Sequence, residues 1–409
     1  MNISNDQEPD EITVLDEVPA SQRRWVLQAL RDETTGGLLL MAVTVIALIW
    51  ANSPWSHSYE HIANLPFGTP QFSLPLNIWA ADFLLAIFFF VAGVELKHEF
   101  VSGTLSSPRK AAVPMAAALG GMVTSAVIFL AINHSSGHQS AWGIPISTDI
   151  AFALAILAIA GRKLPIELRS FLLTLAVVND LGAITVIAIF YSHGFHAKYF
   201  AIALVLIAIF ATLQSRGFRH VAFYIPLALG TWYAMYESGI HATVAGVAMG
   251  LAMRVTPRGS EKLSPGDQAE HAIRPISSGL CVPIFALLSA GVSLQGFSIS
   301  AGLTHPLTLG VLCGLVIGQP LGVTLAAYVT TKLTGGSLNE ELTWWDVLVV
   351  GSLASIGFTV ALLVSEVSFA DDPATLAISK FAIVLTNVVA MSVAITAISL
   401  RSRFIGRYR

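Results

Sequence analysis

Two carboxylates stand inside long apolar stretches of this chain. Asp149 lies within residues 144–153 and Asp180 within residues 173–183, and neither has a Lys or Arg within ten residues along the sequence. A carboxylate at bilayer depth costs at least about 2.5–3.5 kcal/mol on insertion scales, so such residues persist mainly where they have a partner or a function. Burial disfavours the charged form of a carboxylate, and its oxygens suit hard cations. The two residues therefore predict a site inside a membrane that binds a cation or a proton.

Helix-breaking residues interrupt two of the apolar stretches. Gly143 and Pro145 precede Asp149 in one of them, and residues 351–359 of the other contain two glycines and two serines. Such breaks free backbone groups that protein or a water-filled cavity must satisfy, and paired breaks in two halves of a transporter point to its substrate site. Kinked helices with small residues at packing contacts are the alternative. Because Asp149 follows Pro145 by only four residues, we favour broken helices.

The elements that must position these residues are membrane helices. The chain has 409 residues, of which 55% are hydrophobic and 11% charged, whereas soluble domains are about 25% charged. Hydropathy predicts an all-α polytopic membrane protein with twelve transmembrane helices. They are expected near residues 36–53, 78–100, 111–133, 140–160, 165–191, 198–215, 220–236, 239–253, 275–291, 306–331, 344–367 and 373–400.

The distribution of basic residues predicts the orientation. On this map 20 of the 22 Lys and Arg lie on one side of the membrane, Lys198 lies on the other, and Lys380 is inside the last span. The positive-inside rule then places both termini in the cytoplasm and supports an even number of spans. The chain is expected to divide into a disordered acidic cytoplasmic tail, a membrane transport domain and a basic cytoplasmic tail, at residues 1–33, 34–403 and 404–409.

The predicted outside loop at 55–77 contains no Lys or Arg. Its segment 67–74 weakly suggests a β-hairpin, although Pro70 and Pro75 restrict pairing to strand edges. The loop is either a contact between two copies of the chain or an unremarkable connection, and the sequence alone favours the unremarkable connection.

Several short motifs together resemble the NhaA family of sodium–proton antiporters. They run in family order and stand at residues 94–99, 147–154, 179–184, 238–243, 290–294 and 356–359. The resemblance implies two inverted-topology repeats, spans three to five and ten to twelve, with broken helices four and eleven crossing at mid-membrane. It also implies a homodimer and a secondary Na⁺(Li⁺)/H⁺ antiporter that exports sodium at the expense of the proton gradient, for pH and sodium homeostasis.

The chain departs from the family pattern at one pair of residues. Family members typically carry Asp-Asp where this chain has Asn179-Asp180, and a Lys in the tenth span where it has Gln319. We expect the two amides to satisfy each other by hydrogen bonding. If the charged pair carries a second proton in relatives, this chain should exchange one proton per sodium ion and be electroneutral. A second proton on Asp149, which would keep exchange electrogenic, and a degenerate homologue are the alternatives.

The resemblance and the residues together predict a transport site without a cofactor, whose ligands are the cargo ions Na⁺ or Li⁺ and H⁺. The predicted ion ligands are Asp180, Asp149 and Thr148. Residues expected to tune the site are Asn179, Gln319, Ser355 and Gly357, and candidates for pH sensing are Glu95, Glu99, Glu270 and His271.

Other functional classes fit the sequence less well. A channel would favour a repeated pore motif or a continuous polar stripe, and an intramembrane enzyme would need a recognisable catalytic set such as His-Glu-x-x-His, which is absent. A sodium-coupled symporter of an organic solute is the closest rival. Lipid, the ions and a second copy are the expected partners, and no nucleic acid is. Lys380 could reach outward or balance a carboxylate, and Asp82 is expected to be a cap or an interfacial charge.

Overall fold

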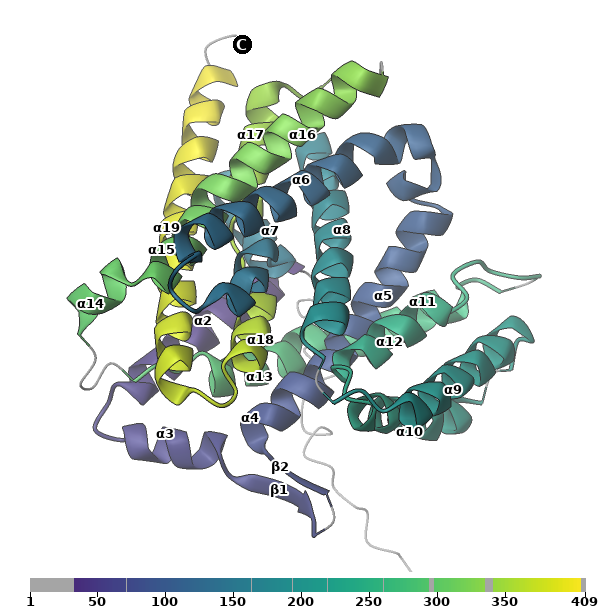
Figure 1. Cartoon of the computed structure of the whole chain (residues 1–409). Helices are drawn as coiled ribbons and strands as arrows, with labels where there is room; N and C mark the ends of the chain where they lie inside the picture. Colours follow the sequence, from purple (N-terminus) through teal and green to yellow (C-terminus); the bar gives the residue numbers. More distant parts are fainter. Residues whose placement is uncertain are drawn as a thin grey trace, which may run out of the picture.

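The computed structural model is built of helices with one small β-hairpin (Figure 1). It describes residues 33–405 except positions 71, 163, 193, 219, 260, 294–297 and 335–340. The predicted acidic tail therefore lies outside the described residues apart from Glu33, as does most of the basic tail at 404–409.

Long apolar helices confirm a polytopic membrane protein. In the part of the chain that the structure describes, eight continuous helical segments are long and apolar enough to cross a membrane, or up to ten if each of two bent pairs counts as one span. Three of the eight contain a π-helical turn, named η in the list that follows. The eight are α2 (Glu33–Ala51), α4–η1–α5 (Leu76–Trp79, Ala80–Leu84, Leu85–Val101), α6 (Pro108–Asn133), α8 (Ile166–Phe190), α9 (Ala197–Ser215), α12–η4–α13 (Pro265–Ile276, Ser277–Cys281, Val282–Ser289), α15–η5–α16 (Pro306–Cys313, Gly314–Gly318, Gln319–Thr334) and α19 (Pro373–Ile405).

Both predicted helix breaks are present. The first bent pair joins the 3₁₀-helix η3 (Gln139–Ile146) to α7 (Ile150–Ala160) at 40°, and the second joins α17 (Trp344–Ala354) to α18 (Thr359–Ser368) at 46°. Every residue from 349 to 366 is buried, so the second break lies in the interior of the molecule.

The two remaining predicted spans form helices that are short for a membrane crossing. They are α10 (Val221–Glu237) and α11 (Thr243–Ala252), of 17 and 10 residues, whereas a crossing takes about 20. Glycines let α11 lie directly on α5, because a Cβ atom on Gly246 would stand 2.1 Å from the carbonyl oxygen of Ala86. Figure 1 shows α9 and α10 side by side at the edge of the molecule.

The loop between the first two predicted spans confirms the hairpin. It contains α3 (Ser56–Ala63) and the antiparallel strands β1 (Pro66–Thr69) and β2 (Phe72–Pro75). Phe72 makes edge contacts with Trp79 and Trp232, which stack on each other with ring centroids 5.6 Å apart. We call the face that carries α3, β1 and β2 the hairpin face. The 26-residue segment that starts at Leu76 leaves it and ends at the opposite face.

The short helix α14 (Ile299–Thr304) precedes α15.

In the interior, α6 and α16 approach closely because a glycine faces a glycine: a Cβ atom on Gly322 would lie 2.2 Å from the carbonyl oxygen of Gly120. These helices, with α8 and α19, surround the two breaks and fix their positions (Figure 1).

Candidate ion-binding site

The two broken helices touch at their breaks. The Asp149 amide donates to the carbonyl oxygen of Ile356 at 2.6 Å, and the Thr148 hydroxyl donates to that of Ala354 at 2.7 Å. Gly357 leaves the space that this contact needs, since a Cβ atom there would stand 2.3 Å from the carbonyl oxygen of Ser147. Hydrogen bonds between the two linkers thus replace helical bonds that the breaks leave unmade, as a structure buried in a membrane requires.

Asp149 joins the starts of two helices. As the N-cap of α7, its Oδ1 accepts from the Phe152 amide at 3.2 Å. Its Oδ2 accepts from the amide and the hydroxyl of Thr359, the first residue of α18, at 3.2 and 2.9 Å. Helix N-termini carry partial positive charge, so the two helices together favour the negative form of this carboxylate, to which no basic side chain of the described residues is bonded.

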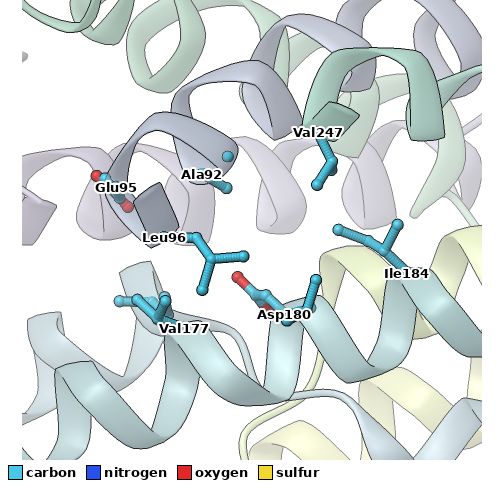
Figure 2. A pocket seen from close by; sticks show the side chains of 10 residues that line it. Ala92, Glu95, Leu96, Val177, Asp180, Ile184 and Val247 are labelled. Atoms are coloured by element: carbon cyan, nitrogen blue, oxygen red, sulfur yellow. The ribbon is translucent and has the colours of Figure 1, made fainter. Parts of the chain in front are cut away.

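Asp180 has a different environment. It lies halfway along α8, is 5% exposed, and its Oδ1 has no hydrogen-bond partner among the described residues. Figure 2 shows its carboxylate pointing from α8 towards α5, beside Leu96. A buried carboxylate oxygen without a partner is costly to the fold and is available to a ligand.

One cavity connects the two aspartates. It has a volume of about 90 Å³ and is lined by Asp149, Asp180, Thr148 and Thr359, and at its far end by Glu95 and Arg274. A smaller space of about 10 Å³ adjoins Asp180 (Figure 2). About 10–15 Å³ on this scale holds one water molecule, so the larger cavity has room for an ion with several waters. Because Glu95 lies in the second half of α5, the cavity extends towards the face opposite the hairpin.

Asn179 and Gln319 do not bond to each other, and that expectation was wrong. Asn179 Nδ2 donates to the Thr148 hydroxyl at 2.7 Å, and Gln319 Nε2 donates to the carbonyl oxygen of Ile146 at 3.3 Å. Both side chains are fully buried. Both amides therefore bond to the first broken helix. Gln319 reaches the carbonyl oxygen of the last residue of η3, which the end of a helix leaves without a helical partner. The Thr148 hydroxyl, which accepts from Asn179, in turn donates to Ala354 at the end of α17.

The sequence interpretation missed two residues of the crossing. Thr359 holds Asp149, as described above. Asn387 of α19 is buried and donates to the carbonyl oxygens of Gly357 and Ile383, both at 2.8 Å. Thr359 stands at the end of a recognised motif, and its place as the first residue after a helix break was a usable signal. Ser355, predicted to tune the site, bonds locally to the Ser352 carbonyl oxygen at 2.6 Å.

Of the four candidates for pH sensing, the structure brings two together. Glu95 and Glu270 both accept from the guanidinium of Arg274, the latter at 2.6 Å, at the end of the cavity. Glu99 instead accepts from the Thr104 amide at 2.9 Å in the turn after α5. His271 is exposed on α12.

Three side chains of types that can ligate metals lie close together beside this ion pair. Ligand atoms of His98, Asp267 and Glu270 all lie within 4.8 Å of one another. His98 Nε2 is already 2.6 Å from Asp267 Oδ1, and Glu270 is paired with Arg274, so internal contacts account for these three side chains.

Two charges left open by the sequence have partners in the structure. Lys380 Nζ lies 3.1 Å from Glu366 Oε1, so it balances a carboxylate. Asp82 is buried in the protein: it is 8% exposed, and its Oδ1 lies 3.2 Å from His241 Nε2.

Comparison with known proteins gives a consistent result. Residues 27–398 match the model of a family described as Na+/H+ antiporter 1. The Na(+)/H(+) antiporter NhaA of Mycolicibacterium smegmatis is 49% identical over 371 residues, which are 89% of this chain and 85% of that protein. The antiporter NhaA 3 of Streptomyces coelicolor is 47% identical over 385 residues, 93% of this chain and 81% of that protein. The NhaA antiporter of Streptomyces antibioticus is 47% identical over 401 residues, 97% of this chain and 83% of that protein.

These similarities extend over nearly the whole chain, including both broken helices and the aspartates between them, and they do not favour the symporter alternative. The chain belongs to the NhaA family of Na⁺/H⁺ antiporters.

Proposed function

We propose that this Na⁺/H⁺ antiporter binds sodium or lithium and protons in turn at Asp180, with Asp149 and Thr148 supplying further oxygen atoms. The observation that carries the proposal is the unpartnered Oδ1 of Asp180 beside a cavity that Asp149 and Thr148 also line. A hard cation prefers such oxygen ligands.

Exchange follows from competition for the same oxygen atoms. With no cation bound, a proton on Asp180 relieves the cost of a buried charge. A cation that reaches the carboxylate makes the proton unnecessary, and the proton leaves through the cavity. Asp149 stays an acceptor throughout, because three hydrogen bonds from the starts of two helices support its negative form. Alternating access would rock one helix bundle against the other around this site.

The proposed molecule has twelve spans, with α10 and α11 as the two short ones. Each of two segments, α6 to α8 and α15 to α19, contains a broken pair between two long helices, which supports two inverted-topology repeats. The bias of Lys and Arg supports cytoplasmic termini in a bacterial inner membrane. There the chain would export sodium using the proton gradient, and contribute to pH and sodium homeostasis.

We further propose that exchange is electroneutral, with one proton per sodium ion. The crossing is held by two neutral amides, Asn179 and Gln319, each donating to one of its acceptors. Neither amide can carry a proton between the two sides. With Asp149 kept as an acceptor, Asp180 is the one carboxylate of the described crossing left to carry the proton.

Reconstituted vesicles with an imposed membrane potential test both proposals. The unmodified chain should exchange Na⁺ for H⁺ at a rate and to a steady state that do not respond to the potential, and Asp180→Asn should abolish exchange while still reaching the membrane. A strong response to the potential would rule out electroneutral exchange. Exchange that survives Asp180→Asn would rule out the site.

A matched variant makes the stoichiometry test specific. Asn179→Asp combined with Gln319→Lys introduces an ionisable pair without changing net charge, and it should make transport respond to the potential. The single change Asn179→Asp buries an uncompensated charge, which costs about 3–5 kcal/mol when one partner of a buried pair is missing. It should therefore lower the amount of folded protein, and this loss separates a stability effect from a change in stoichiometry.

A further inference from the structure

Glu366 on α18 is, like Asp180, a buried carboxylate with one oxygen that has no hydrogen-bond partner among the described residues. The residue is 8% exposed, and its Oε1 accepts from Lys380 Nζ at 3.1 Å. Its Oε2 is buried and has no hydrogen-bond partner among the described residues. The ion pair with Lys380 thus accounts for only one of the two carboxylate oxygens.

Glu366 lies in line with the ion site along one helix. It follows Thr359, which holds Asp149, by seven residues, so both are on the same face of α18 about 10 Å apart along the helix axis. Leu363 lies between them on that face and is fully buried. The helix therefore presents a polar group at the ion site, an apolar residue, and then a carboxylate.

The surroundings of Glu366 place it towards the hairpin face. It lies within electrostatic range of Tyr59 on α3 and of Asp82. The Tyr59 hydroxyl donates to the Leu287 carbonyl oxygen at 2.8 Å and accepts from the Gly291 amide at 2.9 Å, and thereby holds α3 to the end of α13.

A second buried polar atom without a hydrogen-bond partner lies at the end of α13, near Tyr59. Ser289, the last residue of α13, is fully buried, and its Oγ has no hydrogen-bond partner in the described part of the chain. Four polar side chains thus lie near the hairpin face: Tyr59 of α3, Ser289 of α13, Glu366 of α18 and Asp82 of η1. The cavity at Asp180 extends the other way, towards Arg274.

We propose that Glu366 is a second binding station for the transported cation or proton, between the Asp180 site and the hairpin face. The proposal rests on ion exchange at Asp180. When the site opens towards the hairpin face, Leu363 no longer separates Glu366 from the Asp180 site. Oε2 of Glu366 is then the first carboxylate oxygen without a partner that a departing cation or an arriving proton meets. Lys380 neutralises the pair, so the station binds a monovalent cation weakly and releases it.

A purely structural ion pair is the competing explanation, and sidedness distinguishes the two. A station on the route to one face affects ions that arrive from that face. A pair that only holds α18 against α19 affects the protein equally from both faces. Membrane vesicles of opposite orientation therefore separate the explanations, with the apparent KM for sodium measured from each face.

The test uses Glu366→Gln, which keeps the size of the side chain and removes its charge. For sodium presented at the hairpin face, the apparent KM should rise about tenfold, as expected for the loss of one charged ligand. From the opposite face it should stay unchanged. An equal change from both faces, or no change from either, would overturn the proposal.

Two controls make the result specific. Ser365 and Ser379 join the same two helices through a 2.7 Å hydrogen bond next to the ion pair, and Ser365→Ala should leave both KM values unchanged. The double variant Glu366→Gln with Lys380→Gln removes any need for a charged pair and should still show the one-sided change. If it restores both values, the pair is structural and the station is absent. This variant carries the same test if Glu366→Gln does not reach the membrane.

The outcome can be separated from failure of the Asp180 site. Asp180→Asn should abolish exchange from both faces, whatever Glu366 does. If Asp180→Asn transports normally while Glu366→Gln shows a one-sided defect, the assignment of Asp180 fails and the station remains. If Asp180→Asn is inactive and Glu366→Gln is unchanged from both faces, the Asp180 site remains and the station is disproved.

Discussion

At the scale of single residues, Asp149 and Asp180 are equally buried but differ in what their carboxylate oxygens contact. Asp149 accepts three hydrogen bonds from Phe152 and Thr359, whereas one oxygen of Asp180 has no partner among the described residues. The first arrangement satisfies the carboxylate oxygens with protein donors, and the second leaves a carboxylate oxygen that a proton or a cation can satisfy. Hydrogen bonding therefore distinguishes the two carboxylates, and this difference supports the proposal that Asp180 is the one that exchanges a proton for a cation.

Thr359→Val should weaken cation binding. The change keeps the shape of the side chain and removes the 2.9 Å bond from the Thr359 hydroxyl to Asp149. Hydrogen bonds to charged groups contribute about 1.5–3 kcal/mol, so the apparent KM for sodium should rise roughly tenfold or more, measured by the fluorescence of a pH dye in everted vesicles.

Thr308→Val is the matched control. Thr308 is fully buried on α15, and its hydroxyl has no partner among the described residues, so its loss should leave the KM for sodium unchanged. Equal effects of the two variants would mean that the Thr359 hydroxyl has no specific role.

At the scale of elements, the helix breaks position the site. The linker after α17 is held from one side by Asn387 and presses Gly357 against Ser147. No bulkier residue fits at Gly357 unless the two broken helices move apart. The geometry around Asp149 therefore depends on close approach of the backbones, which glycine permits.

Gly357→Ala should push the two broken helices apart at their point of contact. The added methyl group would stand 2.3 Å from the Ser147 carbonyl oxygen, and overpacking of this kind costs about 1–3 kcal/mol. Antiport should fall strongly and the melting temperature of the purified protein should drop. Gly230→Ala is the control: its added atom would lie 3.5 Å from its nearest neighbour, Leu206, so that variant should keep activity and stability. Normal transport by Gly357→Ala would contradict a tight crossing.

The start of α15 should be sensitive to acid. His305 caps it by accepting from the Leu307 amide through Nδ1 at 3.3 Å. Burial, and then the nearby charge of His138, lower the pKa of His305 below its ordinary value of 6.5. Because the folded state favours the neutral ring, this cap contributes fully above pH 6.5 and is lost as the pH falls through the lowered pKa.

The measurement is the melting temperature between pH 8 and pH 5. It should fall further in the unmodified protein than in His305→Asn, because Asn caps helices well and does not titrate. Asp372, which lies within electrostatic range of His138, keeps its charge over this range, since its pKa is held below the ordinary value by hydrogen bonds from Thr375. Identical slopes for the two proteins would show that His305 does not supply the dependence.

At the scale of the whole molecule, the hairpin face carries an exposed two-stranded sheet. All four residues of β1 are exposed, and Phe67 is 62% exposed. The outer edges of a two-stranded sheet leave backbone groups unpaired, and such edges readily pair with another chain. We propose on this ground that 55–77 forms the contact of a homodimer.

Replacing residues 66–75 with a short Gly-Ser turn should yield a monomer. The lost strand edges are the proposed contact, whereas the Asp180 site lies in the interior and should still exchange ions. Light scattering of the detergent-solubilised protein measures the mass, and vesicle assays measure exchange. A dimer that persists in the variant would place the contact elsewhere.

Local properties of the sequence determined the class of the protein, the places of both helix breaks, the hairpin and the two aspartates. Hydropathy, Gly and Pro act on the segment that contains them, so a linear reading finds them. Only the tertiary structure decided that Asn179 bonds to Thr148 instead of Gln319, that Lys380 pairs with Glu366, and that Asp82 is buried against His241. These pairings depend on how each helix is rotated about its axis. One residue turns a helix by about 100°, and an apolar run in a membrane protein carries no marked polar face from which to read that rotation.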